Sequence, residues 1–131
     1  MFVLDTNTVI DFFRGKGRVA ERLLAVPPSE IGLPAITVYE TWVGVLGSRN
    51  ATKRQSQFIE FLAVIEVLPF DAATSRRAAE IRLALERRGE SIGPMDTLIA
   101  ATALEAGGTL VSRNVSEFGR VPELRVINWH D

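Results

Sequence analysis

The sequence predicts an α/β fold in which helices pack around a mostly parallel sheet. Two observations predict this class. Short apolar runs typical of buried strands alternate along the chain with longer segments that have helical periodicity. The chain also has 131 residues, 47% of them hydrophobic, without a linker, repeat or low-complexity segment. We therefore expect a single domain that covers residues 1–131 and has a sizeable core.

The expected strands are the short apolar runs. They occupy residues 1–4, 31–33, 66–70, 109–112 and 125–129. Asp5 directly follows the first run and Asp71 follows the third. Residues 115–122, between the last two strands, are expected to form a loop.

The expected helices are longer segments with helical periodicity, most of them bounded by glycine or proline, and the last of them is apolar on nearly every side and is expected to be central and buried. They occupy residues 7–14, 18–26, 52–64, 72–88 and 94–106. Gly89 is expected to end the helix before it, and Gly93 and Pro94 to open the last one. Thr37 is a candidate N-cap for one more helix. In that helix the positions on one face are Ile36, Glu40, Val43 and Gly47, so Glu40 is expected on an apolar side.

Four oxygen-bearing side chains stand where an apolar segment ends or where no other charge occurs. They are Asp5, Glu40, Asp96 and Asn114. Buried anions without a partner are costly, so something must compensate three carboxylates. A divalent cation such as Mg²⁺ takes carboxylate and water oxygens as ligands, and it can activate water for hydrolysis of a phosphodiester. In a parallel sheet such groups collect beyond the carboxyl ends of the strands.

Each of the four has a simpler structural interpretation. Asp5 can cap the helix that follows it, and Asp96 can interact with the dipole of its helix. Glu40 can pair with an arginine such as Arg82, and Asn114 can be an ordinary turn residue. The pattern of all four together is what favours a metal site.

Composition narrows the chemistry further. The chain has no cysteine and a single histidine, His130, which is expected to lie solvated near the end of the chain. Thiolate sites and a Ser-His-Asp triad are therefore disfavoured. A net charge of -1 argues against a protein that coats nucleic acid. No apolar stretch reaches the length of a membrane span, and the lack of cysteine is compatible with the cytosol, so we expect a soluble cytoplasmic protein.

Four strings of the sequence resemble the PIN-domain family and, more narrowly, the VapC-type ribonuclease toxins of type II toxin–antitoxin pairs. They are LDTNTVIDFFRG, ITVYETWVG, IRLALERRGESIGPMDTLIAATAL and TLVSRNVSEFGRVPELRVINW. The resemblance covers nearly the whole chain and keeps the order and approximate spacing of the motifs. It implies a three-layer α/β/α domain, Mg²⁺- or Mn²⁺-dependent endoribonuclease activity and a homodimer. It also implies a VapB-type antitoxin that lies across the toxin groove and inhibits the site.

The resemblance also assigns site residues. Asp5, Glu40 and Asp96 match the three acidic metal-site residues, and Asn7 and Ser112 match polar residues of the first and fourth motifs. Asn114 stands where many PIN domains have Asp, and Glu117 could supply a carboxylate through water. Because Asn carries no charge, we expect one tightly held ion, with any second ion recruited by the substrate phosphate.

Two further groups of residues have alternative interpretations. Arg82, Arg87 and Arg88 could contact RNA or the antitoxin, or could form a solvated helical face. Trp42 and Trp129 could belong to an interface or to the core.

Two rival functions remain open at this point. A PIN-like binding module whose site has decayed would be favoured by Asn114, but it predicts the loss of acidic residues that are present. A haloacid-dehalogenase-like phosphatase needs a second Asp where Asn7 stands and a later lysine, and the only lysines are Lys16 and Lys53.

Overall fold

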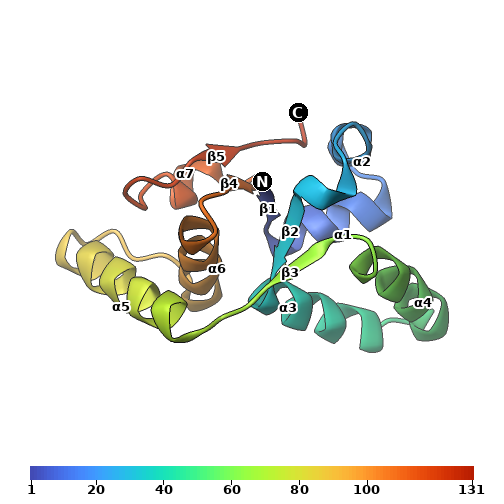
Figure 1. The fold of residues 1–131 in the computed structure, drawn as a ribbon, viewed down its shortest axis with the longest axis horizontal. Helices are drawn as coiled ribbons and strands as arrows, with labels where there is room; N and C mark the ends of the chain where they lie inside the picture. Colours follow the sequence, from blue (N-terminus) through green and yellow to red (C-terminus); the bar gives the residue numbers. More distant parts are fainter.

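Five parallel strands form the centre of the molecule in a computed structural model that describes all residues from 1 to 131 (Figure 1). The strands are β1 (Phe2–Leu4), β2 (Ile31–Pro34), β3 (Glu66–Leu68), β4 (Thr109–Val111) and β5 (Val126–Ile127). They follow the spatial order β3-β2-β1-β4-β5, and every neighbouring pair is parallel. The prediction of a mostly parallel sheet is confirmed.

The helices fill the connections between these strands. They are α1 (Thr6–Arg14), α2 (Val19–Leu24), the short 3-10 helix η1 (Pro28–Glu30), α3 (Ala35–Leu46), α4 (Ala51–Leu62), α5 (Ala72–Arg87), α6 (Pro94–Glu105) and α7 (Val115–Phe118). No helix combines the length and the apolar character that a membrane crossing requires. Gly89, which follows the C-cap residue Arg88 of α5, has a φ of 66°, as expected for a glycine that ends a helix.

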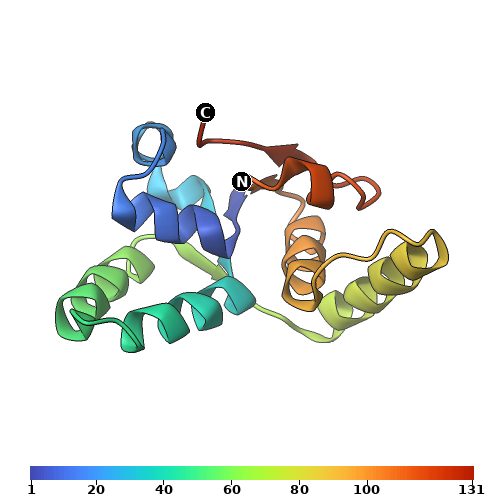
Figure 2. The ribbon, with the colours of Figure 1, turned by 180° about the vertical axis from the view of Figure 1, so that it is seen from behind.

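Alternating side chains of the central strands build a separate core on each face of the sheet. Val3 and Leu110 pack with residues of α5, α6 and α7, whereas Leu4 and Val111 pack with residues of α1, α2 and α4. Figures 1 and 2 show these two groups of helices on opposite sides of the strands. The three-layer α/β/α prediction is therefore confirmed.

The start and the orientation of α3 differ from the prediction. Pro34 precedes the first turn of α3, and Thr37 lies inside the helix, where its hydroxyl donates to the carbonyl oxygen of Leu4 at 3.1 Å. Val43 is 59% exposed, so the face that carries Glu40 is not a buried apolar face. Small hydroxyl side chains, Thr37 and Thr41, are the buried residues of α3.

Two other predictions need correction near the end of the chain. The expected loop at residues 115–122 begins with helix α7, and the strand expected at 125–129 is limited to Val126–Ile127. Trp129 is 7% exposed and its ring centroid lies 5.1 Å from that of Phe2, so it belongs to the core. Trp42 likewise packs on Phe58, with ring centroids 5.0 Å apart.

His130 is buried rather than solvated. Its Nε2 lies 2.7 Å from Oδ2 of Asp11 in α1, and its carbonyl oxygen accepts from the backbone N–H of Arg18 at 3.1 Å. These contacts fix the last residues of the chain against the turn between α1 and α2.

Candidate metal centre

Asp5 and Ser112 meet at the carboxyl edge of the sheet. Asp5 follows β1 and Ser112 follows β4, and the two strands are neighbours in parallel register. The Ser112 hydroxyl donates to Oδ2 of Asp5 at 2.6 Å, across 107 residues of sequence. The convergence expected from the parallel sheet is present.

Asp5 also caps α1. Its Oδ1 accepts from the backbone N–H of Thr8 at 2.9 Å, so the capping interpretation of Asp5 is confirmed. The residue is only 4% exposed, and burial raises the pKa of Asp5 although hydrogen bonds from Ser112 and Thr8 act in the opposite direction. Each of its oxygens keeps a lone pair available for a further ligand.

Glu40 projects from α3, which directly follows β2. Its Oε1 accepts from the Thr6 hydroxyl at 2.6 Å, and the side chain is half-buried. The alternative pairing with Arg82 is wrong, because Arg82 donates to Glu86 at 2.8 Å within α5. The short bond to Thr6 ties Glu40 to the residue next to Asp5.

Asp96 lies half-buried in the first turn of α6. Burial, followed by the negative charges of Glu117, Asp5 and Glu40, raises the pKa of Asp96 to about 6. The charges of three carboxylates from separate segments therefore disfavour the ionised form of Asp96. A helix N-terminus alone would favour the ionised form, so the raised pKa reflects the neighbouring carboxylates and burial.

Glu117 is the fourth member of this group. Its Oε1 accepts from the backbone N–H of Gly93 at 3.2 Å, and its Oε2 accepts from the side-chain amide of Asn114. Glu117 faces Asp96 from α7, the helix that was expected to be a loop. Asn114 and Glu117 are three residues apart, which is about one helical turn. This spacing could have predicted that the two side chains lie together at the site.

The structure also shows the surroundings of Asn7, Arg87 and Arg88, which the sequence named as candidate supporting or contact residues. Asn7 is exposed at the start of α1, and its side chain forms no hydrogen bond. Arg88 donates to Glu90 and to the carbonyl oxygen of Arg120, whereas Arg87 is exposed and has no ion-pair partner.

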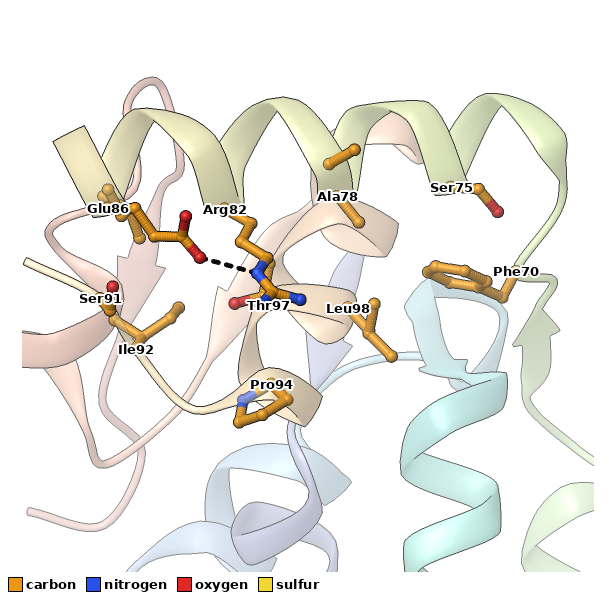
Figure 3. Close-up of a pocket in the computed structure, with 12 residues that line it drawn as sticks. Phe70, Ser75, Ala78, Arg82, Glu86, Ser91, Ile92, Pro94, Thr97 and Leu98 are labelled. Carbon is orange, nitrogen blue, oxygen red and sulfur yellow. Dashed lines mark hydrogen bonds and ion pairs between the residues drawn. The ribbon is translucent and has the colours of Figure 1, made fainter.

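A separate cavity of 590 Å³ lies between α5 and α6. Figure 3 shows Arg82 and Glu86 beside it, together with apolar side chains such as Phe70 and Leu98. None of the four carboxylates lines this cavity, so it is not part of the acidic site.

The chemistry of the four carboxylates fits a divalent cation. No Arg, Lys or His forms an ion pair with any of them. In the present rotamers no three acidic side chains converge closely enough to form a ready ligand set. Both oxygens of Asp5 and of Glu117 and one oxygen of Glu40 instead accept from local donors. A cation would offset both the burial and the carboxylate repulsion that raise the pKa of Asp96.

Comparison with known proteins identifies the family of the chain. Residues 2–124 match the family model of the PIN domain. A relative from Salmonella typhimurium, "tRNA(fMet)-specific endonuclease VapC", is 33% identical over 128 residues, which cover 98% of this chain and 97% of the relative. The "Toxin FitB" of Neisseria gonorrhoeae is 33% identical over the full length of both chains.

Solved structures give the same result. The DNA-bound VapBC structure from Salmonella typhimurium superimposes with a TM-score of 0.90 at 31% identity, covering 98% of this chain and 97% of that one. VapBC2 from Rickettsia felis, bound to a DNA fragment from its promoter, gives a TM-score of 0.89 at 31% identity and covers 98% of each chain. The chain therefore belongs to the PIN-domain family and resembles the VapC-type toxins within it.

Proposed function

We propose that this chain is a Mg²⁺- or Mn²⁺-dependent endoribonuclease and the toxin of a type II toxin–antitoxin pair. The observation that carries the proposal is Asp96, whose pKa is raised by burial and by the negative charges of Glu117, Asp5 and Glu40, while none of these four carboxylates has a cationic ion-pair partner. The relatives named as VapC endonucleases and ribonucleases support the same activity.

In this proposal the four carboxylates hold the cation. A bound divalent ion supplies a water of lowered pKa and stabilises the charge that develops on the phosphoryl group. The residues of the chain fix the ligands: Ser112 and Thr8 orient Asp5, and Thr6 orients Glu40. A carboxylate of the group can accept the proton of the attacking water. The single histidine is engaged with Asp11, so a carboxylate is the base that the chain offers.

The partners and the location also belong to this proposal. The related solved structures are VapBC and FitAB toxin–antitoxin complexes, which supports a cognate VapB-type antitoxin that inhibits the nuclease. We also propose a cytoplasmic homodimer that acts on RNA. The phosphatase alternative gains no support, because neither Lys16 nor Lys53 is among the groups that interact with Asp5.

The direct test is cleavage of total RNA by the purified chain, freed of any partner, in Mg²⁺, in Mn²⁺ and in EDTA. We expect discrete fragments that require the metal ion and that decrease about 100-fold or more in an Asp96→Asn variant, since a ligand to the developing charge is lost. Glu66→Gln is the matched control, because Glu66 is an exposed carboxylate at the opposite, amino end of β3.

Two results would count against the proposal. Equal cleavage by the wild type and the Asp96→Asn variant would assign the activity to a contaminant. Absence of cleavage by a folded wild type that still binds its antitoxin would favour the decayed binding module.

A further inference from the structure

We propose that Asn114 is a positioning residue that holds Glu117 at the metal centre and is not itself a metal ligand. This inference rests on the proposed function, because it assigns the fourth carboxylate of the same site. It changes the assignment expected from sequence, in which Asn114 is the fourth site residue and Glu117 supplies a carboxylate through water.

The contacts of Glu117 are the first argument. Both of its oxygens are held, Oε2 by the Asn114 amide and Oε1 by the backbone N–H of Gly93. Gly93 is the residue just before α6, and a Cβ on it would lie 3.5 Å from Oδ2 of Asp96. Glu117 is thus tied beside Asp96, where two negative charges would otherwise move apart.

The position of Asn114 is the second argument. Its backbone N–H donates to Oγ of Ser112 at 2.9 Å, and the Ser112 hydroxyl donates to Asp5 at 2.6 Å. A continuous chain of hydrogen bonds therefore runs from Asp5 through Ser112, Asn114 and Glu117 to Gly93. It connects the ends of β1 and β4 with α7 and with the start of α6.

The chemistry of the amide is the third argument. The Asn side chain has NH₂ donors that a carboxylate accepts, whereas an ionised Asp at the same place can only accept. An Asp at position 114 would face Glu117 with a second negative charge and would release it. Asn is thus the residue type that this contact requires.

The deciding variant is Asn114→Asp, which changes one amide to a carboxylate without changing the size of the side chain. If position 114 bound the metal ion directly, this variant would gain a charged ligand and bind more tightly. If Asn114 positions Glu117, the variant loses about 10- to 100-fold in Mg²⁺ or Mn²⁺ affinity, as for other residues that orient ligands.

The experiment measures binding of Mn²⁺ and Mg²⁺ alone by titration calorimetry, in the absence of RNA. The proteins compared are the wild type, Asn114→Asp, Glu117→Gln and the double variant that carries both changes. The double variant keeps an amide and a carboxylate in contact but exchanges their places. Circular dichroism confirms folding, which we expect to be intact because Asn114 is exposed.

We expect weaker binding in both single variants and no recovery in the double variant, because its carboxylate stands at position 114. Tighter or unchanged binding by Asn114→Asp, or recovery of wild-type affinity in the double variant, would overturn the inference. Neither result would affect the proposed nuclease function, which fails instead if the wild type binds neither metal ion.

Discussion

At the scale of single residues, the sequence predicted some members of the acidic group and missed others. Asp5, Glu40 and Asp96 were expected to share a site, because each is an isolated charge in an apolar or uncharged segment. The raised pKa of Asp96 agrees with that expectation. Glu117 was expected only as a supporting residue, because a Glu in an expected loop is not an isolated charge in an apolar segment. The burial of His130 could not be predicted either, since its partner Asp11 lies 119 residues away.

The charge on Asp96 has a measurable effect on stability in the absence of metal. The pKa of Asp96 is about 6 in the folded chain against an ordinary value of 3.8, so the folded state binds more protons between these pH values. The free energy of unfolding therefore falls as the pH rises through this window. Asp96→Asn removes the charge, and in EDTA at pH 7.5 we expect it to be more stable than the wild type.

We expect this difference to be on the order of 1 kcal/mol, after allowance for the solvent screening of a half-exposed group. Urea unfolding at pH 4 and pH 7.5 measures it, and the difference should become smaller at the lower pH. Saturating Mg²⁺ should reverse the order, because only the wild type keeps the full ligand set. A variant that is less stable than the wild type in EDTA at pH 7.5 would contradict the account of the carboxylate group.

At the scale of elements, the sequence predicted the long helices and the central strands well, because their periodicity and their glycine and proline boundaries are strong signals. It placed the start of α3 wrongly, since Thr37 has the properties of an N-cap but is used inside the helix to reach Leu4. It missed α7 because a helix of four residues is too short to show a period.

The turn between α1 and α2 provides a test at this scale. Gly15 and Gly17 both have positive φ, 66° and 60°, but only Gly17 lies against the end of the chain. A Cβ on Gly17 would lie 2.6 Å from the carbonyl oxygen of His130, whereas a Cβ on Gly15 meets nothing within 4 Å.

We expect Gly15→Ala to cost about 1 kcal/mol of unfolding free energy through backbone strain alone. Gly17→Ala should cost at least about 1 kcal/mol more, because the end of the chain must also move. Paired denaturant titrations of the two variants measure the difference. Equal costs would show that the contact of residue 130 with this turn contributes nothing.

At the scale of the whole molecule, the topology is what creates the site. The central strands β1 and β4 are neighbours, so residues more than a hundred positions apart meet at one edge of the sheet. The sequence could predict this edge from the rule for parallel sheets, but it could not predict which surface stays uncovered. Val43 was expected on an apolar face of its helix, yet it is 59% exposed.

We propose that Asp5, Glu40, Asp96 and Glu117 together form a metal centre at the carboxyl edge of the sheet. The most direct measurement is a crystal structure of the chain with Mn²⁺, with diffraction data collected at the manganese absorption edge. We expect an anomalous peak in contact with Asp96 and Asp5 and adjacent to Glu40 and Glu117. A folded protein that shows no peak among these four side chains at saturating Mn²⁺, or a peak only elsewhere, would contradict it.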